Sequence, residues 1–257
     1  MGKREGYDPG TFSWVDLSTG DVGGAKDFYG GLFGWEFEDD EIPGGGIYTM
    51  CYLRGDAVAA MVEQDQHPGH WNNYVTVTSV DETAEKAGRL GTRVIEKPFD
   101  VMESGRMAVL ADPDGAVLCA WEPRDHIGAG RVNDAGCMAW NELQSRAPEK
   151  ASSFYRDLFG WQMEPIDQDG STVYLTIRNS AGWMNGGIMP LSGRQGDAPS
   201  FWLTYFTVPS CDRAVERAEE SGGGLLAGPM EPGMGRIAVL NDPQGAVFAV
   251  FEGETDE

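Results

Sequence analysis

Apolar and polar positions follow one pattern that occurs twice along the chain. Residues 27–35 read DFYGGLFGW, and residues 153–161 read SFYRDLFGW. In the first copy, Phe28, Leu32 and Phe33 have the i, i+4, i+5 spacing of a single buried stripe on a helix. The glycine after Phe33 can adopt a positive φ and end that helix. Each copy therefore predicts an amphipathic helix that is followed by a strand.

A stretch of alternating residues precedes each predicted helix. Residues 12–18 put Trp14 and Asp16 on one face of a strand, because side chains alternate between the two faces of a sheet. The corresponding residues of the second copy are Trp140 and Glu142, each 126 positions further along the chain. The pattern predicts two equivalent opening strands, each with a tryptophan and a carboxylate on the same face.

The remaining elements also repeat in order. In each half a strand, a second helix and further strands follow, and an Asp-Pro-x-Gly turn at residues 112–115 and 242–245 joins the last two strands. Order, spacing and turn chemistry together indicate a tandem duplication. We predict a first half at 11–122, a polar linker at 123–136 and a second half at 137–253.

Charge and cysteine content narrow the partners and the compartment. The chain has 41 acidic residues against 19 lysines and arginines, a net charge of −22. Nucleic acids and anionic membranes need a basic surface, so we expect neither as a partner. No apolar run is long enough to span a bilayer, no apolar signal core begins the chain, and the four cysteines form no C-x-x-C pair. We expect a cytoplasmic protein with reduced thiols, as a monomer or a homodimer.

The motifs together resemble one family. A helix that ends in Phe-Tyr-x-x-Leu-Phe-Gly, a second helix that opens with Val80 and Asp81, and a closing Asp-Pro-x-Gly hairpin are similar to the vicinal oxygen chelate superfamily. That superfamily holds glyoxalase I, bleomycin resistance proteins and extradiol dioxygenases. The resemblance extends from Phe12 to Glu252 and is strongest to two-module members labelled glyoxalase-like or hydroxylase. It implies an α+β fold in which tandem βαβββ modules form curved mixed sheets with concave cups.

The resemblance also implies a divalent metal, held by His, Gln or Glu at three strand positions per module. Carried onto this chain, those positions fall at Trp14, Asn72 and Cys119 in the first half and at Trp140, Leu203 and Ala249 in the second. None of the six is a histidine or a carboxylate, and Trp, Leu and Ala cannot bind a metal through their side chains. A shift of two residues in this alignment would bring in Asp16 and Glu142. We predict no cofactor and no tightly bound divalent metal.

The repeated carboxylates and the strand aromatics are the candidate site residues. Asp16 and Glu142 would act as acid, base or hydrogen-bond acceptor, or would instead form a structural salt bridge at the module seam. The candidate ligand-binding residues, which would otherwise belong to the core, are Trp14, Asn72, Tyr74, Cys119, Trp121, Trp140, Trp202 and Tyr205. The three histidines, His67, His70 and His126, lie in predicted loops or the linker, where we expect exposure to solvent.

Three functions remain open at this point. The first is a metal-independent small-molecule-binding protein of the glyoxalase/bleomycin-resistance type, which binds an aromatic or polyketide-like compound for resistance, sequestration or biosynthetic tailoring. The second is a glyoxalase-like lyase or a tailoring enzyme that uses Asp16 or Glu142 as general base or metal ligand. The third is a duplicated scaffold without a ligand. We favour the first, because the family's metal-binding residue types are missing while aromatic residues occupy the cup positions.

Overall fold

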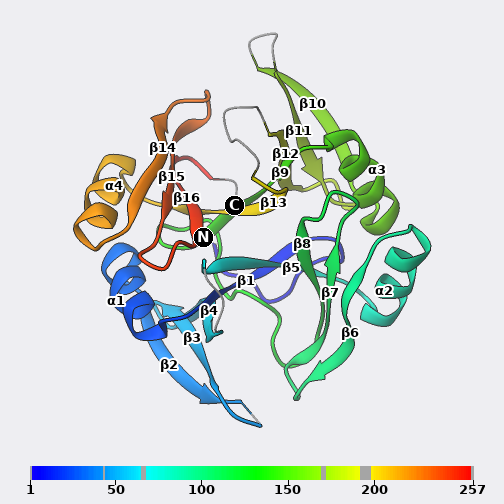
Figure 1. The fold of residues 1–257 in the computed structure, drawn as a ribbon, viewed down its shortest axis with the longest axis horizontal. Helices are drawn as coiled ribbons and strands as arrows, with labels where there is room; N and C mark the ends of the chain where they lie inside the picture. Colours follow the sequence, from blue (N-terminus) through cyan, green and yellow to red (C-terminus); the bar gives the residue numbers. More distant parts are fainter. Residues whose placement is uncertain (1, 43, 65–67, 169–171, 192–197, 256–257) are drawn as a thin grey trace.

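The computed structural model describes residues 2–42, 44–64, 68–168, 172–191 and 198–255. These residues form sixteen strands and four helices (Figure 1). The elements of the first half are β1 (Phe12–Thr19), α1 (Val22–Phe33), β2 (Glu36–Glu41), β3 (Ile47–Leu53), β4 (Asp56–Glu63), β5 (His70–Thr76), α2 (Val80–Arg89), β6 (Val94–Val101), β7 (Gly105–Ala111) and β8 (Val117–Pro123). Those of the second half are β9 (Met138–Ser145), α3 (Pro148–Phe159), β10 (Gln162–Gln168), β11 (Thr172–Arg178), β12 (Met184–Pro190), β13 (Phe201–Thr207), α4 (Cys211–Glu220), β14 (Gly224–Met230), β15 (Gly235–Asn241) and β16 (Val247–Gly253).

Each half forms one mixed eight-stranded sheet. The strand order is β2-β3-β4-β1-β5-β8-β7-β6 in the first sheet and β10-β11-β12-β9-β13-β16-β15-β14 in the second. The two inner strands of each sheet, β1 with β5 and β9 with β13, are antiparallel. Each inner strand also pairs in parallel with the last strand of its own βαβββ module. The predicted α+β fold with tandem βαβββ modules is confirmed.

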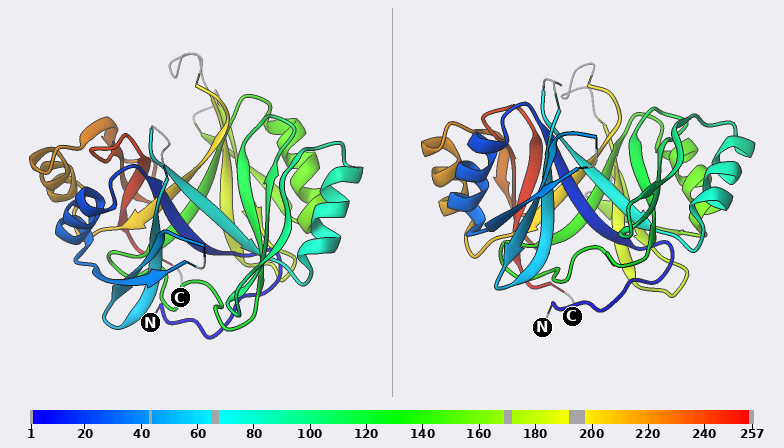
Figure 2. Two further views of the ribbon diagram at one scale, coloured as in Figure 1. Left: turned by 60° about the horizontal axis from the view of Figure 1, so that its bottom comes forward. Right: turned by 90° about the horizontal axis from the view of Figure 1, so that it is seen from below.

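The helices lie on the sheet faces that meet between the two halves. Helices α1 and α4 are side by side at one end of the molecule, and α2 and α3 are side by side at the other (Figures 1 and 2). Between these pairs the sheets contact each other directly, and Thr204 of β13 donates a 3.0 Å hydrogen bond to Asn73 of β5. The opposite face of each sheet is left uncovered by the described helices. We call the face with Trp14 and Asp16 the first cup and the face with Trp140 and Glu142 the second cup.

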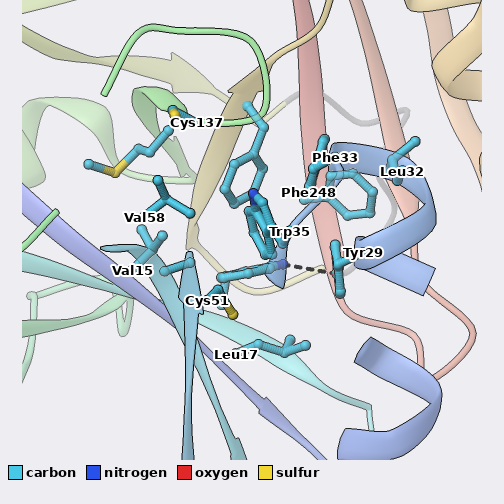
Figure 3. Close-up of a cluster of buried hydrophobic side chains, with 14 of the residues drawn as sticks. Val15, Leu17, Tyr29, Leu32, Phe33, Trp35, Cys51, Val58, Cys137 and Phe248 are labelled. Atoms are coloured by element: carbon cyan, nitrogen blue, oxygen red, sulfur yellow. Dashed lines mark hydrogen bonds between the residues drawn. The ribbon is translucent and has the colours of Figure 1, made fainter. Parts of the chain in front are cut away.

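The hydrophobic core at the α1–α4 end is built from both halves. Phe33 of α1 lies with its ring 5.0 Å from Phe206 of β13, and Tyr29 lies 5.5 Å from Phe248 of β16. Figure 3 shows Tyr29, Phe33 and Phe248 in this cluster, together with Trp35. The stripe predicted from the helix pattern is therefore buried, but its partners come largely from the other half. The two halves are separate sheets that share their cores.

The repeated tyrosine and the repeated turn aspartate bind each other across the halves. The Tyr29 hydroxyl donates to Asp242 at 3.1 Å, and the Tyr155 hydroxyl donates to Asp112 at 3.2 Å. The other oxygen of each aspartate accepts backbone N–H groups of its own turn, as Asp112 does from Ala116 at 2.9 Å. The Phe-Tyr motif and the Asp-Pro-x-Gly motif thus recur together because each half holds the other half's turn.

The tryptophan that ends each repeated motif makes a second reciprocal contact. The Trp35 indole donates to the Gly136 carbonyl at 2.7 Å, and the Trp161 indole donates to the Gly10 carbonyl at 2.6 Å. Both glycines have a positive φ, 85° and 86°, which a residue with a side chain adopts only at a cost. Each tryptophan therefore fixes the segment that leads into the opening strand of the other half.

The first half holds the backbone that leads into helix α3. Its N-cap residue, Ala147, has no side-chain acceptor of its own. Asp114, in the turn between β7 and β8, accepts instead from the backbone N–H of Arg146 at 2.9 Å and of Ala147 at 3.0 Å. Burial raises the pKa of Asp114, but hydrogen bonds from Ser200 and from these N–H groups outweigh it and hold the pKa below the usual value.

We expect Asp114→Ala to lower the free energy of unfolding by about 1.5–3 kcal/mol, the usual contribution of hydrogen bonds to a charged group. A carboxylate with a lowered folded pKa stabilises the fold above its unfolded pKa, about 3.9, and loses this effect as the pH falls through the folded value. Urea unfolding of variant and wild type at neutral and acidic pH measures both effects. Asp27→Ala, at an exposed position of α1, is the control. If the difference in unfolding free energy between variant and wild type is the same at neutral and at acidic pH, the charge of Asp114 has no role in stability.

Candidate functional site

The first cup places a buried carboxylate between two tryptophans and two tyrosines. The β1–β5 register puts Trp14 opposite Tyr74 and Asp16 opposite Asn72, and the β5–β8 register puts Cys119 beside Tyr74. Because these residues are at matching positions of neighbouring strands, they share one sheet face. Asp16 is only 3% exposed, so its carboxylate depends on protein donors rather than on water.

Three side chains donate hydrogen bonds to Asp16. The Tyr74 hydroxyl lies 2.6 Å from Oδ2, the Tyr48 hydroxyl lies 3.0 Å from Oδ2, and the Asn72 amide lies 2.8 Å from Oδ1. The Trp14 indole in turn donates to the Tyr48 hydroxyl at 3.1 Å. Burial raises the pKa of Asp16 although these bonds oppose it, and burial together with the Asp16 charge raises the pKa values of both tyrosines. The phenols are therefore protonated donors at neutral pH.

The second cup repeats this arrangement around Glu142. Its Oε1 accepts from the Tyr205 hydroxyl at 2.8 Å and from the Gln144 amide, and the Tyr174 hydroxyl is a further hydrogen-bond partner. The Trp140 indole donates to the Tyr174 hydroxyl at 2.9 Å, as Trp14 does to Tyr48. Burial raises the pKa of Glu142 against the effect of these bonds. Both cups therefore hold a tryptophan, two tyrosines and a buried acid in the same order.

The amide donor is the main difference between the two networks. Leu203 lies opposite Glu142, where Asn72 lies opposite Asp16, so no cross-strand amide is available in the second cup. Gln144, two residues further along β9, supplies it instead. The longer glutamate side chain thus occurs together with a donor on its own strand. The two networks therefore have the same kinds of donor and acceptor, although different residues supply the amide.

Sequence reasoning did not select Tyr48 and Tyr174 as site residues. Both hydroxyls nevertheless lie between the cup tryptophan and the cup carboxylate. The signal was present, because Tyr174 follows Tyr48 by the same 126 positions that separate the two tryptophans. A repeated polar residue on a neighbouring strand is therefore informative even where its distance in sequence from the other candidates is large.

His126 is not the solvent-exposed linker residue that the sequence predicted. Its imidazole packs edge-on against Trp14, with the ring centres 4.5 Å apart, and lies 5.9 Å from Trp121. The Trp121 indole donates to the His126 carbonyl at 2.9 Å. Burial lowers the pKa of His126 to about 4, so the imidazole is neutral at pH 7. The linker therefore contributes an aromatic ring to the first cup.

The remaining candidates divide between the cups and the core. Trp121, 4% exposed, and Cys119 lie in the first cup, and Trp140 and Tyr205 lie in the second. Trp202 lies on the opposite face of its sheet, where its indole donates to the Tyr155 hydroxyl at 3.0 Å. Trp202 is thus a core residue of the α2–α3 end and does not face the second cup.

The cup residues do not fit a divalent metal. In the part of the chain that the structure describes, no three His, Cys, Asp or Glu side chains are grouped as metal ligands. The first cup offers only one carboxylate, that of Asp16, which already accepts three hydrogen bonds, and one thiol, that of Cys119. Of the family positions carried onto the chain, Trp14 and Asn72 are not cross-strand partners; the register pairs Trp14 with Tyr74.

Two further observations concern compartment and partners. All four cysteines are buried free thiols. Within the described residues, none of the helices has both the length and the apolar character needed to cross a membrane.

Comparison with known proteins gives one family. The model described as the Glyoxalase/Bleomycin resistance protein/Dioxygenase superfamily matches residues 11–120 and 137–250. The chain is 38% identical to "Putative glyoxylase CFP32" of Mycobacterium tuberculosis over 98% of both chains. It is 34% identical to "Anthracycline biosynthesis protein DauV" of Streptomyces sp. strain C5, over 96% of this chain and 94% of that one.

Solved structures with the same fold include a Mn(II)-bound glyoxalase and a 2,3-dioxygenase. The Mn(II)-bound glyoxalase from Novosphingobium aromaticivorans has a TM-score of 0.66 and 17% identity, over 100% of this chain and 86% of that one. The 2,3-dioxygenase LapB from Pseudomonas sp. KL28 has a TM-score of 0.67 and 14% identity, over 96% of this chain and 93% of that one. At these identities the likeness concerns the fold.

Proposed function

Because this chain belongs to the glyoxalase/bleomycin resistance protein/dioxygenase superfamily, we propose that it binds a small aromatic or polyketide-like compound without a metal. The binding would serve sequestration, resistance or biosynthetic tailoring. The observation that carries the proposal is the cup itself: in each half, tyrosine and amide donors satisfy a buried carboxylate that shares its sheet face with a tryptophan. Such a network can hold the polar edge of a planar ligand by exchanging one hydrogen bond, while the tryptophans contact its ring.

A relative's name supports the class of ligand. DauV carries the name of an anthracycline biosynthesis protein, and anthracyclines are planar aromatic polyketides. The apolar side chains of the second cup suit such a molecule. Leu203, Tyr205 and Ala249 form a cluster of their own there, flanked by half-buried Trp140, Phe201, Ile237, Val239, Val247 and Phe251. An apolar cup with one polar network at its base favours an apolar ligand that has one polar edge.

The test uses protein purified with and without a chelator and titrated with 1,4-dihydroxyanthraquinone, a neutral planar quinone with two phenolic hydroxyls. We expect saturable binding, measured by calorimetry, with the same affinity in both preparations. Elemental analysis of each preparation provides the control. A stoichiometric divalent metal whose removal abolishes binding would contradict the metal-independent proposal.

A tailoring or lyase activity is the second candidate. Burial raises the pKa of Glu142, which makes it a stronger base than an exposed glutamate, and one relative is named as a glyoxylase. Turnover of a methylglyoxal–thiol hemithioacetal, lost in Glu142→Gln and retained after chelation, would favour this candidate over binding alone.

The compartment and the assembly belong to the same proposal. Four buried free thiols suit a reducing cytoplasm, and the net charge of −22 disfavours nucleic acid as a partner. The protein would act there as a monomer or a homodimer.

A further inference from the structure

We propose that the protein binds one ligand per chain, in the second cup, and that the ligand's ring lies against Trp140 as the His126 imidazole lies against Trp14 in the first cup. This inference rests on the proposed function and adds the location, the pose and the stoichiometry. It also assigns His126 a role: the linker side chain occupies the ligand position of the first cup.

The linker holds His126 in place through its backbone. The N–H groups of Arg124 and His126 both donate to the Ser104 carbonyl at 3.0 Å, and the His126 carbonyl accepts from Trp121. A few residues later, the Ala129 N–H donates to the Ser13 carbonyl at 2.7 Å, next to Trp14. The segment is thus tied to the β6–β7 loop on one side and to β1 on the other. These backbone hydrogen bonds fix the place from which the His126 side chain reaches Trp14.

The imidazole closes the first cup. Trp14 and Trp121, the two rings that it contacts, are 2% and 4% exposed. The first-cup aromatics consequently belong to the same buried cluster as the α1–α4 core. His126 Nε2 is itself buried, and none of the described residues forms a hydrogen bond with it. A buried ring nitrogen without a partner costs free energy. A ligand with the same planar shape would make the same ring contacts.

The second cup has two equivalent rings, and no described residue covers them as His126 covers Trp14. Trp140 corresponds to Trp14, and Phe251 corresponds to Trp121, because Phe251 lies beside Thr207 as Trp121 lies beside Thr76. Both are half-buried, and Trp140 packs with the Leu203–Tyr205–Ala249 cluster rather than beneath a ring of the kind that His126 supplies in the first cup. The second-cup side chains form a cluster separate from the main core. By the pseudo-symmetry of the two halves, we expect a bound ring in the second cup at the place that corresponds to the His126 imidazole in the first cup.

The charges select the kind of ring. Glu142 lies at the base of the second cup, and the whole chain carries a net charge of −22, so an anionic ligand is repelled. The His126 imidazole, which occupies the ligand position in the first cup, is a planar ring. It is neutral, because burial lowers its pKa. The expected ligand is a neutral planar aromatic compound with a hydroxyl or carbonyl edge that faces the Tyr174–Glu142 network.

The test is isothermal titration calorimetry of the full chain with 1,4-dihydroxyanthraquinone. For the wild type we expect one equivalent per chain. Trp140→Ala should weaken binding by about two- to tenfold, because stacking energy of the order of an aromatic pair is lost. Phe251→Leu, which keeps an apolar side chain, guards against a folding defect and should weaken binding in the same direction. His126→Ala should leave binding in the second cup unchanged and add a second equivalent in the first cup, because it uncovers Trp14.

The outcomes separate this inference from the proposed function. Two equivalents on the wild type, or unchanged affinity in both Trp140→Ala and Phe251→Leu, would overturn the assignment to the second cup, while binding itself would stand. One equivalent on His126→Ala would overturn the role given to His126. Absence of binding to wild type and to every variant would contradict the proposed function and the inference together. Circular dichroism melting of each variant shows that the compared proteins are folded.

Discussion

Residues 1–136, produced alone, are expected to give no folded monomer. This fragment contains the complete first sheet and α1, but Phe33 packs on Phe206 and Tyr29 on Phe248, which both belong to the second half. The hydrogen bond from Tyr29 to Asp242 would also be lost. An apolar helix stripe and a buried phenol left without partners cost several kcal/mol, which is comparable to the whole stability of a domain. Size-exclusion chromatography and circular dichroism of the fragment measure the result.

The matching control is the fragment mixed with residues 137–257. Mixing should restore the far-ultraviolet signal of the intact chain, because the second half supplies the missing core. Self-association of the fragment alone would agree with a surface that needs a partner. A cooperative unfolding transition from a monomeric fragment would show that the shared core is dispensable, and would contradict the expectation.

Trp161→Ala is expected to lower the free energy of unfolding by about 3–5 kcal/mol, the usual cost of removing a large buried aromatic side chain. The Trp161 side chain is fully buried at 0% exposure and packs against Tyr155, 5.2 Å away, and Phe12 of the other half, 5.4 Å away. Its indole also holds the Gly10 carbonyl. Urea unfolding followed by circular dichroism measures the change.

The duplication provides two comparisons for this substitution. Trp35→Ala removes the equivalent residue, which holds Gly136, and should cost a similar amount. Trp183→Ala removes a tryptophan that is 67% exposed and should change stability by less than about 0.5 kcal/mol. A Trp161→Ala protein as stable as Trp183→Ala would mean that the reciprocal indole contacts do not support the fold.

Much of the fold could be predicted because the same sequence pattern occurs in both halves of the chain. The helix stripe at Phe28, Leu32 and Phe33 is buried as expected, and α1 ends at Phe33, where Gly34 takes a φ of 75°. Local rules determine such features: spacing sets the buried side of a helix, and a glycine that tolerates positive φ ends it. The repetition then confirms each local interpretation at an independent place in the sequence.

The site was predicted less completely, and the reasons differ between residues. Trp202 and Tyr205 were both proposed for ligand binding, yet they are three residues apart on one strand, so alternation places them on opposite faces. That conflict was readable from the sequence. The position of His126 was not, because it depends on where the linker returns to the sheet and has no repeated counterpart to suggest it.

Contacts between the halves were also beyond sequence reasoning. The Tyr29–Asp242 bond joins residues 213 positions apart, and nothing local to either residue identifies its partner. Within one half, Tyr29 and Asp112 belong to the same repeat and would have been the natural pair to propose. The arrangement of the two sheets, with α1 beside α4, decides instead that each tyrosine binds the other repeat's turn.

This crossed pairing has a consequence for how the sequence can change over evolutionary time. The two repeats cannot change independently of each other. A substitution of Tyr29 removes a hydrogen bond to Asp242, which organises a turn of the other repeat, and a substitution of Tyr155 does the same to Asp112. Compensating changes should therefore be found in the opposite repeat, so that positions 29 and 242 vary as one unit and positions 155 and 112 as another. The internal symmetry of the chain would then be preserved by mutual constraint between its repeats, even after the two cups have diverged.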